Sequence, residues 1–516
     1  MKKFYPATAA KRNAIVGRFL AITAMVFVLL FQGNRVSAQV SLTATAGTLT
    51  GTYSTLKAAF DAINAGAANS SLPAFKRALE LGAVCAIVES TPTNMEDTSK
   101  LIYVDNTLKA LTDLGIYSRS NAVKLRAIAV TGSVGKTTTK EMLRSILHFF
   151  GPTIYSKDSY NNHLGVPLSL SLLGSDSKYG VFEVGMDHVG EIAPLAKIVE
   201  PEIAIITTIA PSHIGNLGSL EAIVDEKCQI FTSLRENGIA MVHGDHPLFD
   251  RIQSNAKSHG VHNIFTVGHK AGLDARLLHY QPVQQGTKGL VTAEIFGKIV
   301  AYPLHFAGEQ YAFNSLYVLL TAEVLGLDLG ETIQQLAKVQ PVIGRGQMHN
   351  LQLPNGLPIF VYDDAYNANL VSMSAGLKSF CAIPHQGKRI AIIGQMGGLG
   401  DHSDSHHLKI AEYINTLPID RVHVVGPLAK GLHQALNDKK RGDWFPTVDE
   451  LKENFLSELK GYESIFLKEL YLDDFIFLTL VEGYVESGHY REDTRESPYF
   501  VFADAVLGEL SFFLLD

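Results

Sequence analysis

The stretch Ala127-Ile-Ala-Val-Thr-Gly-Ser-Val-Gly-Lys-Thr-Thr-Thr-Lys140 decides the fold class of this chain. Its apolar start, residues 128–130, predicts a strand that breaks at Gly132, and Thr137 opens a pattern that predicts a helix over residues 140–150. A strand, a glycine turn and a helix N-terminus bind phosphate well, because backbone N–H groups and the helix dipole both favour negative charge. The sequence therefore predicts a nucleotide-binding loop in an α/β fold.

Within this loop, each residue type has an expected task. Lys136 would neutralise the β- and γ-phosphates, and the hydroxyl of Thr137 would bind Mg²⁺. The strict pattern G-x-x-x-x-G-K-[ST] is shortened here, since its first glycine would fall at Val130. The alternative is a chance glycine turn before a helix that carries a surface lysine. The residues expected to bind the nucleotide are Gly132, Ser133, Val134, Gly135, Lys136, Thr137 and Thr138.

Composition places the chain among large globular proteins. Its 516 residues favour several domains. A chain with 46% hydrophobic and 18% charged residues can form sizeable hydrophobic cores. The formal charge of −7 and the lack of a long basic run argue against nucleic acid as a partner. Its three cysteines have neither metal-site spacing nor a disulfide pattern, which favours a reducing compartment.

The first 38 residues point to a different compartment. Basic residues precede an apolar run at 19–31, and Val36-Ser37-Ala38 resembles a small-residue cleavage site, which together form a secretory signal pattern. The run is too short for a confident membrane span, and an ordinary buried helix is the other interpretation. Because ATP chemistry belongs in the cytosol, we expect a cytoplasmic protein, with a membrane-attached or exported form as the alternative.

Before Arg126, the patterns predict helices at 56–63 and 73–81 and strands at 84–88 and 101–104. Strand and helix patterns alternate from Arg126 onward, which is typical of a mostly parallel sheet, and residues 236–305 are expected to hold short strands and turns. A linker-like stretch at 341–345 precedes a second α/β unit that we expect to be Rossmann-like. We therefore predict a leader (1–38), a partial N-terminal domain (39–118), a central nucleotide-binding domain (119–340) and a C-terminal domain (341–516). The pattern loses coherence past Phe466, so that an irregular tail is expected.

Polar side chains follow the ends of predicted strands. Glu183 ends a strand at 179–184, and His213 follows a strand at 203–208, where a second metal ligand is expected in a parallel sheet that carries a phosphate loop. Asn161 and Asn162 precede a Gly-Val-Pro turn; their amides could hold a polar substrate or only cap a helix, and the second interpretation is favoured. Lys227 lies on a predicted helix at 220–231, where a lysine is usually solvated.

A histidine cluster in the C-terminal part is a weaker signal. A zinc site is conceivable there, but a solvated helix start is favoured. The cluster contains Asp401, His402, Asp404, His406 and His407.

Taken in order, these stretches resemble the Mur ligases, in particular the MurF type, over about residues 73–466. The resemblance rests on 131–140, on Asn161-Asn-His-Leu-Gly-Val-Pro167, on Glu183-Val-Gly-Met186, on Glu226-Lys227 and on Asp363-Asp-Ala-Tyr-Asn-Ala-Asn369. It implies an ATP-dependent ligase that adds D-alanyl-D-alanine to UDP-N-acetylmuramoyl-tripeptide through an acyl phosphate, in peptidoglycan precursor synthesis. It also implies a protein that acts as a monomer.

The resemblance assigns roles to residues whose position alone says little. Lys136, His213 and Lys227 would be catalytic, and Lys227 matches a lysine that is carbamylated in this family. Thr137 and Glu183 would hold one Mg²⁺, and His213 would help to hold a second. Asn314 would contact the adenine, and Arg345 and Asp364 would close over the nucleotide. Asn161 and Asn162 would lie beside the UDP-linked substrate.

The chain also departs from the family pattern. Gly308-Glu-Gln-Tyr-Ala-Phe-Asn314 lacks two of the usual polar residues, residues 1–72 do not resemble a UDP-binding domain, and no K-G-S/A-R stretch follows Phe466. Two alternatives follow: a MurF-like nucleotide-binding protein that has lost ligase activity, and another amino-acid ligase of the superfamily. A secreted or membrane-tethered protein is a third, supported by the leader alone.

Overall fold

The computed structural model describes residues 40–42, 51–53, 85–89, 98–284, 286–353, 355–455 and 458–468. The chain divides into two compact units, one of Met1–Asp105 with Glu496–Asp516 and one of Asn106–Arg495. The predicted leader, the helices expected at 56–63 and 73–81, and the tail beyond residue 468 lie outside the described residues. Within the described ranges, no helix combines the length and the apolar character needed to cross a membrane.

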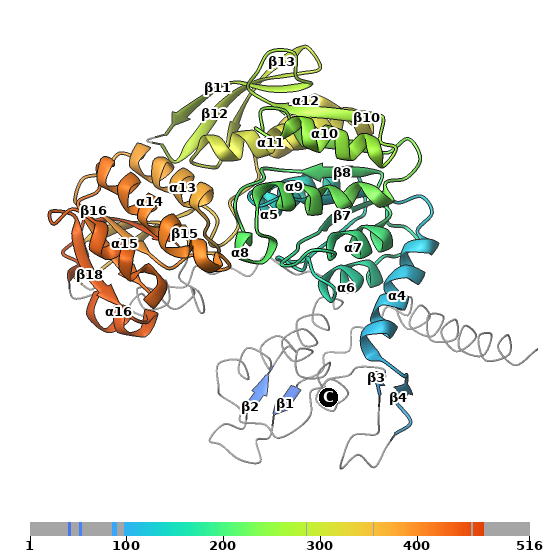
Figure 1. Cartoon of the computed structure of the whole chain (residues 1–516), viewed down its shortest axis with the longest axis horizontal. Helices are drawn as coiled ribbons and strands as arrows, with labels where there is room; N and C mark the ends of the chain where they lie inside the picture. Colours follow the sequence, from blue (N-terminus) through green and yellow to red (C-terminus); the bar gives the residue numbers. More distant parts are fainter. Residues whose placement is uncertain are drawn as a thin grey trace, which may run out of the picture. The chain divides into compact units, whose positions relative to one another are not determined.

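The smaller unit contributes two short strand pairs (Figure 1). Strand β1 (Val40–Leu42) pairs antiparallel with β2 (Gly51–Tyr53), and β3 (Ala86–Val88) pairs parallel with β4 (Leu101–Tyr103). The strands predicted at 84–88 and 101–104 are therefore confirmed.

A nine-stranded sheet organises the first part of the larger unit, in the order β13-β12-β11-β10-β9-β8-β5-β7-β6. Strands β5 to β10 run parallel to one another, whereas β11, β12 and β13 form an antiparallel ribbon at one edge of the sheet. The mostly parallel sheet of the prediction is confirmed. The strands are β5 (Arg126–Thr131), β6 (Thr153–Tyr155), β7 (Tyr179–Glu183), β8 (Ile203–Ile206), β9 (Ile239–His243), β10 (Asn263–Gly268), β11 (Ala275–Val283), β12 (Lys288–Ile295) and β13 (Lys298–Leu304).

Helices cover both faces of this sheet, which explains why residues 127–130 of β5 are all apolar and buried. Ile128 and Val130 of β5 belong to the core formed with α5 (Lys136–Phe150), α11 (Glu309–Leu325) and α12 (Leu329–Leu336). Ala127 and Ala129 point to the other face, since side chains alternate along a strand. That face packs against α6 (Gly165–Ser171), α7 (Ile192–Val199), α9 (Leu220–Cys228) and α10 (Phe249–Ser258).

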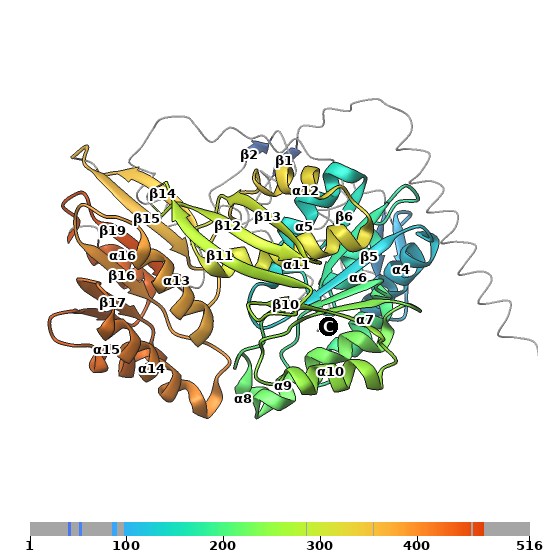
Figure 2. The same cartoon turned by 90° about the horizontal axis from the view of Figure 1, so that it is seen from above.

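Two features of this part differ from the sequence prediction. Residues 236–305 were expected to hold short strands and turns, but α10 lies there, and Figure 2 shows the long strands β11 and β12 over α11. Helix α10 was missed because it is mostly polar, with only Ile252 and Ala256 buried. Helix α4 (Thr107–Asn121) lies in the larger unit and packs on α6 and α7.

A six-stranded sheet follows residues 341–346, which form neither helix nor strand, as predicted for a linker. Its order is β14-β15-β19-β16-β17-β18, parallel except for the edge strand β14. The strands are β14 (Gln347–Gln352), β15 (Pro358–Asp364), β16 (Arg389–Ile393), β17 (Arg421–Val425), β18 (Arg441–Phe445) and β19 (Ser464–Lys468). The covering helices are α13 (Leu370–Ala382), α14 (Ser403–Thr416), α15 (Lys430–Ala435) and α16 (Val448–Phe455).

The expectation of an irregular chain past Phe466 is wrong for its first two residues. Phe466, Leu467 and Lys468 complete β19, whose five residues are all buried between β15 and β16. A short strand that is buried on both faces shows no alternation of polar and apolar residues, so that its pattern gave no signal.

Candidate active site

One cleft of about 1340 Å³ brings together most of the predicted site residues. It lies among the loop after β5, the carboxyl ends of neighbouring strands, and residues of the C-terminal sheet and α13. Gly132 and Lys227 are the predicted residues that do not line it. Those that line it are Ser133, Val134, Gly135, Lys136, Thr137, Thr138, Asn161, Asn162, Glu183, His213, Asn314, Arg345 and Asp364.

The phosphate loop runs directly into helix α5, which begins at Lys136, four residues earlier than predicted. The first intrahelical bond joins the N–H of Thr139 to the carbonyl of Gly135, so the N–H groups of residues 135–138 are those available at the helix N-terminus. Ser133 and Val134 instead donate their N–H groups to the carbonyl of Thr208, at 2.8 and 3.1 Å. The donors for phosphate are therefore at the helix start.

Two positions of the phosphate loop require glycine, because neighbouring side chains lie too close to leave room for a Cβ atom. Gly132 has φ +149°, and a Cβ there would lie 1.9 Å from Oγ1 of Thr207. Gly135 has φ +88°, and a Cβ would lie 2.6 Å from Oδ1 of Asn314 on α11. The side chain of Asn314 thus packs directly on the phosphate loop, beside any nucleotide held there.

The Lys136 ammonium lies in the cleft and donates to the carbonyl of Gly132 at 2.9 Å. Burial lowers its pKa, and the carboxylate of Glu183 opposes that shift. A half-buried cation next to the N–H groups of a helix start attracts a polyanion more strongly than a surface lysine does, because fewer water molecules screen it.

Glu183 and Thr137 form the candidate metal site. Oγ1 of Thr137 donates to Oε2 of Glu183 at 2.7 Å, and Nδ2 of Asn161 donates to Oε1 at 2.8 Å. Glu183 is only 1% exposed. A buried carboxylate and a hydroxyl at the phosphate loop are hard oxygen donors, which fit Mg²⁺.

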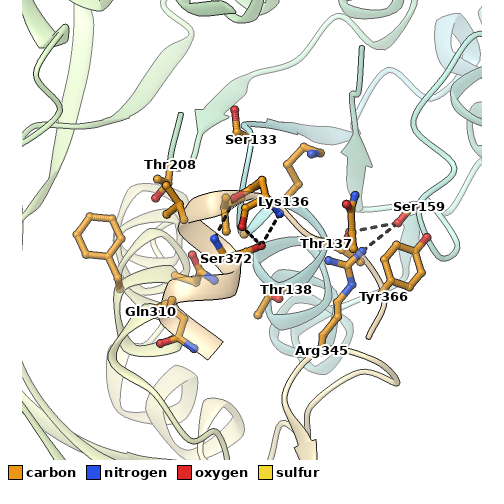
Figure 3. Close-up of a pocket in the computed structure, with 18 of the residues that line it drawn as sticks. Ser133, Lys136, Thr137, Thr138, Ser159, Thr208, Gln310, Arg345, Tyr366 and Ser372 are labelled. Carbon is orange, nitrogen blue, oxygen red and sulfur yellow. Dashed lines mark hydrogen bonds between the residues drawn. The ribbon is translucent and has the colours of Figure 1, made fainter. Parts of the chain in front are cut away.

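Ser159 joins this group to the C-terminal part of the unit, as Figure 3 shows. Its Oγ lies 3.4 Å from Oγ1 of Thr137 and accepts a 3.2 Å hydrogen bond from a guanidinium NH2 of Arg345. The guanidinium also stacks over the ring of Tyr366, 4.0 Å from its centroid. Sequence reasoning missed Ser159 and Tyr366; both adjoin the asparagine-bearing stretches at 161–162 and 367–369.

His213 is held in a strained backbone conformation beside an acid. Its φ is +57°, which is uncommon for a residue other than glycine, and its Nδ1 lies 3.0 Å from Oδ1 of Asp187. Burial lowers its pKa, and Asp187 opposes that shift. Asp187 lines the same cleft, two residues after the loop glycine that follows β7, and was not predicted.

Lys227 is buried rather than solvated, with 2% of its surface exposed. Burial lowers the pKa of Lys227 well below its usual range, and the positive charge of Lys136 lowers it further. The neutral amine is therefore favoured much more than in a surface lysine, and a neutral amine is the form that reacts as a nucleophile.

The two asparagines have different partners. Asn161 orients Glu183, whereas Oδ1 of Asn162 accepts the N–H groups of Leu164 and Gly165 at the start of α6. The capping interpretation therefore describes Asn162. Both residues still line the cleft.

Asp364 is paired across the C-terminal sheet. Its Oδ2 lies 2.6 Å from Nζ of Lys468, the last residue of β19, and both are buried. Lys468 lines the cleft too, and sequence reasoning missed it because β19 itself was missed.

An aromatic group lines the cleft next to Asn314. The ring of Phe313 stacks on His269 with centroids 5.7 Å apart, and its edge meets His243 at 4.6 Å. Burial lowers the pKa of His243 to about 4, so that this ring is neutral at pH 7. Such surfaces favour a planar base.

Within the described residues, the histidine cluster on α14 does not bring three ligand atoms close enough together to hold a metal ion. His407 uses both ring nitrogens, since Nε2 accepts the N–H of Met396 and Nδ1 lies 2.8 Å from the carbonyl of Ser403. The solvated helix start favoured from the sequence describes His402, which is exposed, but it is wrong for His406 and His407, which are buried.

Elsewhere in the described ranges, His423, Asp443 and Glu458 lie close enough to share a cation. Nδ1 of His423 accepts the N–H of Asp443 at 3.2 Å, so its neutral form carries the proton on Nε2, which faces Glu458 at 3.6 Å. A protonated nitrogen cannot bind a metal, and this group is better described as a buried histidine with two acidic neighbours.

Comparisons with known proteins agree with this geometry. Residues 130–322 match the Mur ligase middle domain, and residues 344–468 match the Mur ligase glutamate ligase domain. A UDP-N-acetylmuramoyl-tripeptide–D-alanyl-D-alanine ligase of Rickettsia prowazekii is 33% identical over 391 residues, covering 76% of this chain and 85% of that protein.

Solved structures are similar as well. MurF from Acinetobacter baumannii has a TM-score of 0.69 at 29% identity, covering 78% of this chain and 86% of that one. MurF from Thermotoga maritima, in complex with ADP, has a TM-score of 0.64 at 24% identity, covering 77% and 87%. Fold and cleft together define an ATP-dependent peptide-bond-forming ligase. The chain belongs to the Mur ligase family, as the sequence resemblance predicted.

Proposed function

We propose that this ligase joins D-alanyl-D-alanine to UDP-N-acetylmuramoyl-tripeptide with ATP, in the synthesis of peptidoglycan precursors. The observation that carries the proposal is the 33% identity to a ligase of that name over most of both chains. The cleft supports it, because a phosphate loop, hard oxygen donors and a buried lysine all face one space or adjoin it.

The reaction has two steps. A carboxylate oxygen of the tripeptide attacks the γ-phosphorus of ATP, which forms an acyl phosphate and releases ADP. The dipeptide amine then attacks the acyl carbon, loses a proton, and phosphate leaves from the tetrahedral intermediate. Lys136 and the α5 N-terminus neutralise the negative charge in both steps, and Arg345 adds charge from the C-terminal side.

Thr137 and Glu183 would hold one Mg²⁺, and His213 would help to hold a second. The ions, when bound, neutralise the triphosphate and fix the γ-phosphate for attack. Carbamylation of Lys227 fits its burial: the neutral amine would add to the carbon of CO₂ with loss of a proton, which turns the side chain into an anion able to face a metal.

Asn314 would contact the adenine, with His243, His269 and Phe313 as the neighbouring surface. Arg345 and Asp364 would close over the nucleotide, and exclusion of water would protect the acyl phosphate from hydrolysis. Asn161 and Asn162 would lie beside the UDP-linked substrate, Asn161 also orienting Glu183.

The domain limits at 118/119 and 340/341, a cytoplasmic location and a monomeric state are part of this proposal. The dependence of the reaction on ATP and a UDP-linked precursor supports the location. Fractionation of cells and size-exclusion chromatography of the full chain would test the last two.

The deciding experiment measures phosphate release with ATP, Mg²⁺, UDP-N-acetylmuramoyl-tripeptide and D-alanyl-D-alanine, and identifies the ligated product by mass spectrometry. We expect release only when all components are present. Phosphate release without dependence on the dipeptide, or nucleotide binding without release, would instead favour a protein that has lost ligation. Turnover with a different amine would favour another ligase of the superfamily.

A further inference from the structure

Lys140 is a fully buried cation on the helix that starts at the phosphate loop. Its ammonium donates to the carbonyls of Ser156 and Asp158, both at 2.7 Å, and lies 2.5 Å from a carboxylate oxygen of Glu141. Its side chain has no exposed surface. A buried ammonium is stable only when its donors are matched, so these two carbonyls must stay in place around it.

The two carbonyls belong to the loop between β6 and α6, which has the geometry of a constrained segment. Asp158 has φ +44°, an uncommon value for aspartate, and the N–H of Tyr160 closes a turn onto the carbonyl of Lys157. The hydroxyl of Ser156 accepts the N–H of Glu183, which ties the loop to β7. Lys140 thus holds the first part of this loop at two points, the carbonyl of Ser156 and that of Asp158, the residue with positive φ.

The residues that follow supply the contacts of the candidate metal site. Ser159 reaches both Thr137 and Arg345, and Asn161 donates to Glu183. The loop therefore meets all three elements that would surround a triphosphate: the helix start, the end of β7 and the linker to the C-terminal sheet.

We infer that Lys140 is a positioning residue: it holds the loop at 156–161 so that Ser159 and Asn161 orient Thr137, Glu183 and Arg345 around a metal-bound nucleotide. Lys140 does not itself line the cleft. The inference rests on the proposed function only in requiring that the cleft bind Mg²⁺ with a nucleotide.

The test compares ADP affinity with and without Mg²⁺, by calorimetry on the full chain. In Lys140→Met the loop loses its anchor, and we expect the enhancement of ADP affinity by Mg²⁺ to fall at least tenfold, while affinity without Mg²⁺ changes less than threefold. A residue that only stabilised the fold would weaken both affinities alike. Lys140→Arg, which can still reach two carbonyls, should recover part of the enhancement.

Glu141→Gln is the matched control, because it removes the ion-pair partner and keeps both carbonyl contacts; its Mg²⁺ enhancement should equal that of the parent protein. If Lys140→Met does not fold, Ser159→Ala decides, since it removes the loop's contact to Thr137 and Arg345 at a half-buried site and should lower the same enhancement. The inference is overturned if Mg²⁺ raises the ADP affinity of Ser159→Ala, or of folded Lys140→Met, as much as it raises that of the parent protein. Absence of ADP binding in the parent protein would overturn the proposed function as well.

Discussion

Oγ1 of Thr137 and Oε2 of Glu183 are joined by a 2.7 Å hydrogen bond that links the first turn of α5 to the end of β7. Helix α5 follows β5, the strand that pairs with β7, so these two side chains, 46 residues apart in the chain, meet where a triphosphate would end. Their oxygens are the pair that the proposed function assigns to Mg²⁺.

Replacing Glu183 with Gln should remove the charge of this pair while keeping its shape. We expect kcat to fall about 100-fold, since loss of a charged metal ligand costs about 3 kcal/mol of transition-state stabilisation. Phosphate release as a function of Mg²⁺ concentration measures the effect. Glu221→Gln, on the exposed side of α9, is the control, and an unchanged Mg²⁺ requirement in Glu183→Gln would contradict the assignment.

Replacing Lys136 with Ala should remove the cation of the phosphate loop. We expect kcat/KM for ATP to fall about 100-fold or more, because removal of one group that stabilises developing charge costs that much in comparable sites. Lys257→Ala changes an exposed lysine of α10 and should have no effect. If both variants turned over ATP alike, the phosphate loop would not be the nucleotide site.

Replacing His269 with Ala should weaken binding of the base. A base stacked on an aromatic ring gains about 1–3 kcal/mol, so we expect the Kd for ADP to rise roughly tenfold. Inorganic tripolyphosphate, which has no base, should bind as before. Equal losses for both ligands would show that His269 acts through the fold, and His259→Ala at the end of α10 is the control.

Stability should depend on pH through His423. Burial lowers the pKa of His423 to about 4 from its usual 6.5, so the unfolded chain binds a proton between these values that the native chain does not. The free energy of unfolding should therefore fall as the pH drops from 6.5 to 4, by about 3 kcal/mol from this residue.

The sole tryptophan, Trp444, lies on β18 opposite Val424 of β17, so its fluorescence can follow the unfolding of this region. Urea unfolding at pH 7.5 and 5.0 should show a smaller pH dependence for His423→Gln than for the parent protein. An unchanged pH dependence would mean that His423 has the same pKa in the native and unfolded states, so that burial does not lower it.

The ion pair between Asp364 and Lys468 should behave as a coupled unit. Lys468→Met leaves a buried carboxylate without its cation, which typically costs 3–5 kcal/mol. The double variant Lys468→Met, Asp364→Asn should recover much of that loss, because no buried charge is left. Additive losses in the double variant, measured by urea unfolding, would show that the two groups are energetically independent.

The sequence predicted the parts of the fold that carry a local signal. The apolar run before Gly132 forms β5, Lys136 begins the helix that follows it, and Glu183 ends β7; a parallel sheet brings the carboxyl ends of its strands to one edge. Helix α10 and strand β19 lack such signals, since α10 is mostly polar and β19 is a short, fully buried strand without alternating polar and apolar residues.

The sequence predicted which residues form the site better than it predicted the contacts among them. Lys227 looked like a solvated helix lysine because burial depends on tertiary packing, which its helix pattern does not reveal. Ser159 and Lys468 reach the cleft through a strained loop and a central strand that join the site from distant parts of the chain. Such contacts depend on topology, which local patterns leave open.

The position of β19 between β15 and β16 has a consequence for how the protein is made. A ribosome synthesises β15 and β16 about 70 to 110 residues before β19, so the two strands that flank it must wait as unpaired edges. The C-terminal sheet can close only after residue 468 has left the exit tunnel. Nascent chains halted earlier would expose those edges, and they are the forms that a chaperone would meet.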